Sequence, residues 1–140
     1  MKKLLVLLAF IGAAFATANK AQAQVTNLFS QYGLTVDTVD NTETLYLSPT
    51  ATISGYRKVI TIQFLAVEVS GTTGGTAQVQ GSLDGTNFFN IGSAYTLTDV
   101  ASQVTSFTVT DWGCLYLRLK VTGTGTMSTK IYAKYLGRNS

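Results

Sequence analysis

The stretch Ala77–Ile91, AQVQGSLDGTNFFNI, decides the fold of this 140-residue chain. Before Asp84 its side chains alternate with the period of two that is typical of a β-strand. The Asp84-Gly85 pair is a strong hairpin signal, because a type I′ turn needs a positive φ at both central residues. We therefore expect two strands that meet at this turn, with Asp84 as a turn former. The expected apolar face comprises Ala77, Val79 and Leu83, and the polar face comprises Gln78, Gln80 and Ser82.

Short strand-like stretches recur along the rest of the chain. In Lys58–Val69 every even position up to Ala66 is apolar and the second half is apolar on both faces, as in a central strand covered on both sides. Cys114–Val121 alternates cleanly, with its odd positions from Leu115 onward predicted to be buried. Other expected strands are Leu34–Val39, Thr44–Leu47, Tyr95–Leu97, Gln103–Val109 and Met127–Leu136. This pattern predicts an all-β, antiparallel two-sheet β-sandwich of the jelly-roll-like or immunoglobulin-like kind.

The N-terminal residues have the order of a secretory signal peptide. Lys2 and Lys3 precede an apolar run at 4–15, and Ala21-Gln22-Ala23 forms a small-x-small cleavage site. The apolar run is shorter than the roughly 20 residues that a membrane-spanning helix needs. We therefore expect a signal peptide at 1–23, a flexible or docking arm at 24–33 and a single β-sandwich domain at 34–140. The expected location is exported, in the periplasm or outside the cell, or in a virion, with no stable membrane span after cleavage.

The charge of the expected mature chain is close to zero. The whole chain carries a formal charge of +3, but three of its ten basic residues, Lys2, Lys3 and Lys20, lie in the leader. Seven basic residues then balance seven acidic ones. A nucleic-acid-binding surface is not indicated. Low net charge instead favours the close association of like copies.

The residues that most enzymes and metal sites need are missing or scattered. The chain has no His, which excludes Ser-His-Asp and Cys-His catalysis and most zinc sites. Its acids mostly occur in turns, where Asp accepts local backbone hydrogen bonds. Asp84 with Asn87 and Asn90 is a sparse oxygen set for calcium. The single cysteine, Cys114, is expected to be buried and inert rather than paired between chains. We expect no enzyme activity, no catalytic residue, no cofactor and no metal.

Aromatic and basic side chains remain as functional candidates, because exposed aromatics stack on sugar rings and anchor protein interfaces. If the strands on either side of the Gly123–Gly125 turn pair, their outward residues form one basic-aromatic surface. The alternative is a solvated sheet face. Of the adjacent Phe88 and Phe89, we expect Phe89 to be buried and Phe88 to face a partner. The candidate interface residues are Phe88, Trp112, Tyr116, Arg118, Lys120, Lys130, Tyr132 and Lys134.

Two motifs together resemble small β-rich structural proteins of bacteriophage virions. They are the G-S-x-D-G-T-N-aromatic turn at Gly81–Phe88 and the Y-x-R-x-K-V-T-G-T-G-T hairpin at Tyr116–Thr126. The resemblance implies a non-enzymatic structural or assembly protein, associated with the capsid or on the virion surface. Its partners would be further copies of itself or other virion or surface proteins. Export distinguishes this chain from most such proteins. The alternative is a secreted carbohydrate-binding module, or a bacterial surface or filament module, with glycans as ligands in the first case.

Overall fold

The structure is a computed structural model that describes residues 25–30, 37–49, 53 and 57–138, with the backbone alone for the first range. The expected signal peptide at 1–23 lies outside these residues. The strands are β1 (Val25–Ser30), β2 (Asp37–Asp40), β3 (Thr44–Ser48), β4 (Arg57–Ser70), β5 (Gly75–Ser82), β6 (Phe89–Asn90), β7 (Tyr95–Leu97), β8 (Ser102–Trp112), β9 (Tyr116–Gly123) and β10 (Ser128–Arg138).

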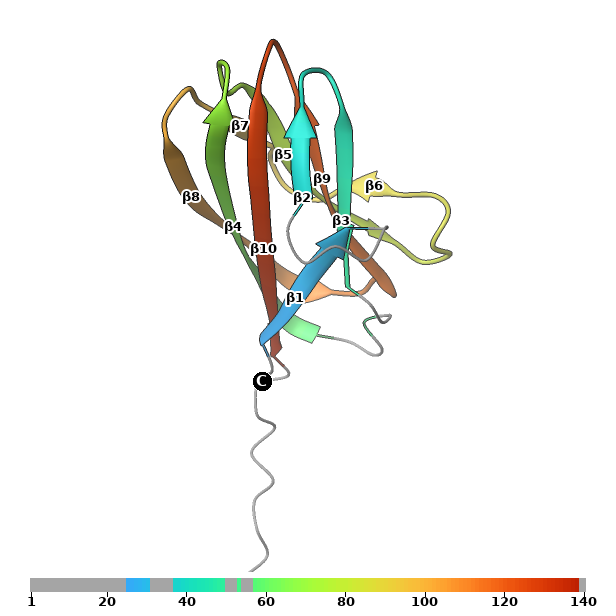
Figure 1. Cartoon of the computed structure of the whole chain (residues 1–140). Coiled ribbons are helices and arrows are strands. Elements are labelled where there is room, and N and C mark those ends of the chain that lie inside the picture. Colours follow the sequence, from blue (N-terminus) through green and yellow to red (C-terminus); the bar gives the residue numbers. More distant parts are fainter. Residues whose placement is uncertain (1–24, 31–36, 50–52, 54–56, 139–140) are drawn as a thin grey trace, which may run out of the picture.

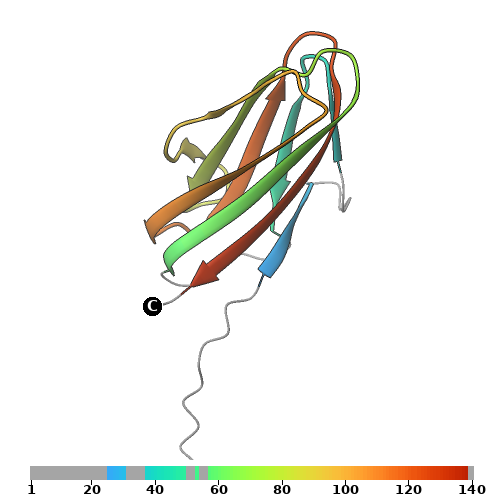
Figure 2. The ribbon, with the colours of Figure 1, turned by 90° about the vertical axis from the view of Figure 1, so that its left-hand side faces the viewer.

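The strands pair antiparallel and form two packed layers (Figure 1). Sheet A has the order β8-β4-β10, with β2 and the first part of β1 both beside β10. Sheet B has the order β6-β5-β9-β3, with β7 also beside β5 and the end of β1 beside β3. β1 thus links the sheets on one side of the sandwich, whereas β8 and β5 lie toward the other, open side (Figure 2). The prediction of an all-β two-sheet sandwich is confirmed.

Part of the segment that we expected to be a flexible or docking arm belongs to the sandwich itself. Residues 25–30 form β1, whose backbone pairs with Ala133–Leu136 of β10 and Leu47–Ser48 of β3. This part of the expected arm therefore pairs with strands of the same chain. Residues 24 and 31–33 lie outside the described residues.

The core fills the space between the sheets and follows the alternation of the strands. Ile60, Ile62 and Phe64 on β4 are fully buried, as their even spacing predicted. Complete burial of such a side chain stabilises the fold by about 1.5–3 kcal/mol. Although β4 has a strand on each side, Val69 is 55% exposed. Because its outward side chains have no second layer over them in the described part of the chain, the expectation of a strand covered on both faces is wrong.

The hairpin expected at Asp84-Gly85 is present with a longer connection. β5 and β6 share two residue pairs, and residues 83–88 form the loop between them. Gly85 has a φ of 74°, but Asp84 is not in the positive-φ region, so the type I′ turn is wrong. Leu83 was expected in the core. It lies in this loop instead and is 62% exposed.

The Gly123–Gly125 turn joins strands of different sheets. β9 pairs with β3 and β5, whereas β10 pairs with β1, β2 and β4. A Cβ at Gly123 would collide with the backbone oxygen of Asn41, so the chain crosses between the layers where only glycine fits. The pairing that we expected across this turn is therefore wrong. The outward residues of β9 and β10 lie on opposite faces of the sandwich.

Candidate functional site: the outer face of sheet B

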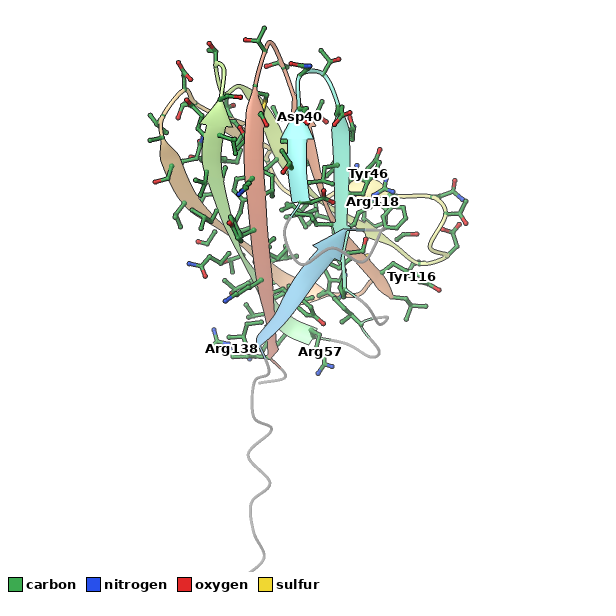
Figure 3. All side chains as sticks on the ribbon, viewed as in Figure 1. Asp40, Tyr46, Arg57, Tyr116, Arg118 and Arg138 are labelled. Atoms are coloured by element: carbon green, nitrogen blue, oxygen red, sulfur yellow. The ribbon has the colours of Figure 1, made fainter. Side chains whose placement is uncertain are left out.

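Arg118 lies at the centre of the outer face of sheet B. The alternation of β9 buries Leu117 and Leu119 and turns the Arg118 side chain outward, beside Tyr46 of β3 (Figure 3). The guanidinium carbon of Arg118 lies 3.7 Å from the ring centroid of Phe88 and 4.2 Å from that of Tyr46. The guanidinium therefore makes cation–π contacts with two aromatic rings at once.

Two amide side chains fix the position of the guanidinium. Arg118 Nε donates a hydrogen bond of 2.7 Å to Gln80 Oε1, and Gln80 Nε2 donates one of 2.7 Å to Asn90 Oδ1. Gln80 is buried, so both ends of its amide are committed to these bonds. We call this set the aromatic–arginine cluster, which comprises Tyr46, Gln80, Phe88, Asn90 and Arg118.

The positive charge of Arg118 has no carboxylate beside it in the described part of the chain. Partial burial lowers the pKa of its guanidinium, an effect that Tyr46 partly offsets, but arginine remains charged near neutral pH. A guanidinium has five N–H donors, and Nε uses one of them on Gln80. Among the described residues, no acceptor is bonded to the donors at its tip, which can therefore bind acceptors from outside. Lys120, two residues further along β9, adds a second cation to the same face.

Asp84 organises the loop that carries Phe88. Asp84 Oδ1 accepts hydrogen bonds of 2.8 Å from the backbone N–H groups of Thr86 and Asn87, and Oδ2 accepts one of 2.7 Å from Asn87 Nδ2. Ser82 Oγ also donates to Asp84 Oδ1 at 2.9 Å. These bonds, with the Asn87 side chain contributing most, hold the pKa of Asp84 well below its usual range. Asp84 is thus a turn former, as expected, and its oxygens are occupied by protein donors.

Half of the predicted interface residues gather on this face. They are Phe88, Tyr116, Arg118 and Lys120. The Tyr116 ring packs against the 83–88 loop, since a Cβ at Gly85 would lie 3.1 Å from its ring carbons. The sequence reasoning missed the other members of the cluster. These are Tyr46, Gln80 and Asn90. Tyr46 lies between the buried Leu45 and Leu47, a signal from which its outward direction could have been predicted.

The remaining predicted residues lie elsewhere. Lys130, Tyr132 and Lys134 project from the outer face of sheet A, because their neighbours in β10 are buried. Trp112 is 1% exposed and packs in the core, so its assignment as an interface or sugar-stacking residue is wrong. A φ of 54° at Asp111 interrupts the alternation of β8 just before it.

The burial expected for Phe89 is also wrong. Phe89 is 52% exposed. It lies on the short edge strand β6, at the end of sheet B. An edge strand of this kind leaves such a ring facing solvent. Phe88, in contrast, covers the guanidinium of Arg118.

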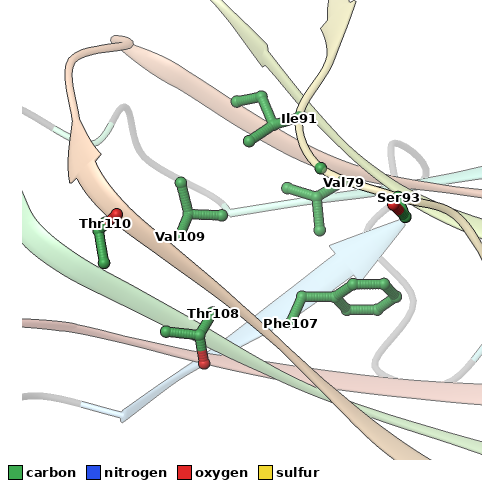
Figure 4. A pocket seen from close by; sticks show the side chains of 8 residues that line it. Val79, Ile91, Ser93, Phe107, Thr108, Val109 and Thr110 are labelled. Atoms are coloured by element: carbon green, nitrogen blue, oxygen red, sulfur yellow. The ribbon is translucent and has the colours of Figure 1, made fainter.

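A cleft of about 350 Å³ opens between the layers on the side away from β1. Its floor is apolar and includes Val79, Ile91 and Phe107, and threonine and serine side chains form its rim (Figure 4). The lining residues are Val79, Ile91, Gly92, Ser93, Phe107, Thr108, Val109 and Thr110. This cleft is distinct from the outer face of sheet B, since its walls are the inward side of β8 and the segment that follows β6.

The described residues hold few of the groups that bind metals or react as nucleophiles. Among them, no three His, Cys, Asp or Glu side chains are close enough to hold a metal ion. Burial raises the pKa of the Cys114 thiol, which packs beside the core as a free cysteine. Within the same residues, no helix has the length and apolar character to cross a membrane.

No family model and no curated protein matches this sequence. Solved structures do match. The CBM22-1-GH10 modules of Clostridium thermocellum xylanase 10B, complexed with xylohexaose, match with a TM-score of 0.52, at 13% identity over 86% of this chain. The CBM22-1-CBM22-2 tandem domain of Paenibacillus barcinonensis Xyn10C matches with a TM-score of 0.50, at 13% identity over 89% of this chain. A tailspike domain of bacteriophage CBA120 has a TM-score of 0.44, at 12% identity over 84% of this chain.

This chain spans only part of each of these proteins. It covers 25% of the xylanase modules, 49% of the tandem domain and 19% of the tailspike domain. At 13% identity, the first two matches show a shared architecture rather than a shared site. The chain thus has the β-sandwich fold that is found in carbohydrate-binding modules.

Proposed function

We propose that this chain is a non-enzymatic, exported module that binds a glycan on the outer face of sheet B. The observation that carries the proposal is the aromatic–arginine cluster. There, a guanidinium contacts two aromatic rings, is fixed by the buried amide of Gln80, and has donors at its tip that bond to no acceptor in the described part of the chain. The fold is similar to that of xylanase modules whose structure is complexed with xylohexaose, and this similarity also supports glycan binding.

The chemistry of the cluster suits a sugar ring. A pyranose has apolar C–H faces, which pack on aromatic rings, and a rim of hydroxyl groups, which accept and donate hydrogen bonds. Tyr116 supplies a further aromatic group on the same face, and Lys120 supplies further donors. The rings and donors come from three adjacent strands and one loop, so the face is held by the sheet before any ligand arrives.

Binding of neutral and acidic polysaccharides on a glycan array, followed by titration calorimetry with the best oligosaccharide, tests this proposal. Tyr116→Ala should weaken binding about tenfold or more, because a stacking residue contributes like an interface anchor. Tyr132→Ala is the matched control, since Tyr132 is also a half-buried tyrosine but belongs to the outer face of sheet A. The proposal fails if no glycan binds, or if both variants weaken binding equally while staying folded.

A second candidate is a structural component of a virion or of a cell-surface assembly that acts by self-association. The unpaired edge of β8 favours it, since among the described strands β8 pairs with β4 alone. The motifs at Gly81–Phe88 and Tyr116–Thr126 support it through their resemblance to virion proteins. Density-gradient fractionation of culture supernatants should find the chain in particles or filaments. Recovery solely as a free, monomeric protein would count against this second function.

A further inference from the structure

β8 presents a long strand edge that nothing in the described part of the chain covers. The strand extends over eleven residues from Ser102 to Trp112. Its sequence contains no Lys and no Pro, and its one charged residue is Asp111. Natural proteins usually protect such an edge with charges, prolines or a covering element. An edge without these features is ready to pair with another strand.

The apolar cleft lies directly beside this edge. Phe107 and Val109 point inward from β8 and are only partly buried, because none of the described strands continues sheet A beyond them. They line the cleft together with Val79 and Ile91 (Figure 4). A strand added alongside β8 would gain main-chain hydrogen bonds and direct every second side chain toward the cleft.

We infer that two copies of this chain pair antiparallel through β8 and join their A sheets into one continuous sheet. Phe107 is the middle residue of β8, so a two-fold axis at this position pairs the full length of both strands. Phe107 then lies opposite Phe107 of the second copy, next to the cleft. Asp111 lies opposite Gln103 of the second copy, so that no two acids face each other.

The charge distribution favours the same orientation. One end of the sandwich, marked by Asp40 in Figure 3, is acidic, and the opposite end, marked by Arg57 and Arg138, is basic. The acidic end carries Asp40, Glu43, Glu68 and Asp99 against one base, Lys130, and the basic end carries Arg57, Lys58 and Arg138 against one acid, Asp111. An antiparallel pair places the acidic end of each copy beside the basic end of the other. A parallel pair would place like charges together.

This inference rests on the second proposed function, for which it names the surface and the partner. It does not depend on glycan binding, because the aromatic–arginine cluster is on the other sheet. We expect the affinity of the dimer to be weak to moderate, because one strand edge with an adjoining cleft buries less area than an obligate dimer interface does.

Sedimentation velocity of the purified chain, between about 1 μM and 1 mM, measures the dimer in the range of weak to moderate affinities. Val104 and Val69 provide a matched pair of substitutions, since both are exposed valines of sheet A, at 60% and 55%. Val104→Lys places a charge on β8 and should raise the dimer Kd about tenfold. Val69→Lys, at the end of β4, should leave the Kd unchanged within about twofold. High salt should weaken the dimer, because the end charges are then screened.

A cysteine pair tests the register directly. In a Cys114→Ala background, a Ser106→Cys chain mixed with a Thr108→Cys chain should form a disulfide-linked heterodimer, since these positions lie opposite each other when Phe107 is central. If Val104→Lys leaves the dimer intact, or if the Ser106→Cys and Thr108→Cys chains do not cross-link, the dimer interface is not β8. Self-association would then still stand. A strictly monomeric chain over the whole range would overturn both.

Discussion

The contact between Arg118 and Phe88 can be measured by a double-mutant cycle. Phe88→Leu removes the aromatic ring, and Arg118→Met removes the guanidinium but keeps an unbranched stem. With 3.7 Å between the guanidinium carbon and the ring centroid, the pair is well inside the roughly 6 Å range of cation–π attraction. Because the site is partly exposed, we expect a coupling free energy of about 0.5–1 kcal/mol. Arg118→Met alone should cost about 1–3 kcal/mol, since the bond to Gln80 is lost as well.

Urea unfolding of the four proteins gives the coupling from their free energies of unfolding. The control cycle combines Arg118→Met with Tyr132→Leu, on the opposite sheet, and should show additivity within about 0.3–0.5 kcal/mol. A coupling between Phe88 and Arg118 no larger than that of the control would refute the reasoning. The loop would then be held by Asp84 alone, and the guanidinium would not be oriented by the ring.

Three further predictions follow from the packing and the titration of single groups. Asp84→Asn should be less stable than the native chain above pH of about 4. This difference should shrink as the pH falls below the unfolded carboxyl's pKa of about 3.9. It should disappear only as the pH approaches the lowered folded-state pKa, because until then the folded state still gains from holding Asp84 ionised; urea midpoints across pH measure it. Cys114 should react with a thiol reagent at pH 8 at least about tenfold more slowly in the native than in the denatured chain, since burial raises its pKa. Gly81→Ala should cost about 1–3 kcal/mol in unfolding free energy, because its Cβ would lie 2.7 Å from Ile91 Cδ1 and 2.8 Å from Cys114 Sγ. Gly113→Ala, which meets nothing within 4 Å, should change the unfolding free energy by less than about 1 kcal/mol.

Local periodicity was enough to predict the fold class and most of the strands, but not β1, which was expected to be part of an arm. The alternation in β9 and in the first half of β4 identified buried faces correctly, because a period of two fixes which side chains share a face. Leu115, which the same alternation placed inside, was the exception. It precedes the strand and is 45% exposed.

The partition of strands between the sheets could not be predicted in this way. The Gly-Thr-Gly turn reads as a hairpin, but it crosses between layers, and this depends on the contact of Gly123 with the distant Asn41. The burial of Trp112 could not be predicted from periodicity either. One left-handed residue, Asp111, shifts the alternation and buries the indole. Such a shift has no signature in the pattern of apolar residues.

The candidate site was only half predictable, for a related reason. Phe88 and Arg118 are far apart in the sequence and meet because β5 lies beside β9. Gln80 was correctly placed on the polar face of its strand. Its link to Arg118 depends on the β5–β9 register, in which the two residues are directly opposite each other.

The surfaces proposed for glycan binding and for self-association are different, so one chain could perform both. An antiparallel β8 dimer would carry two sheet B faces, and a repeating polymer could contact both at once. Linked sites of this kind gain up to about 10²–10⁴ in apparent affinity without any new contact. Val104→Lys should therefore weaken binding to an insoluble polysaccharide, as measured by pull-down, and leave the affinity for a short oligosaccharide unchanged. An equal loss of affinity for the polysaccharide and for the oligosaccharide would mean that the substitution in β8 disturbs the glycan site itself. No loss on either would mean that the two faces cannot engage one polymer together.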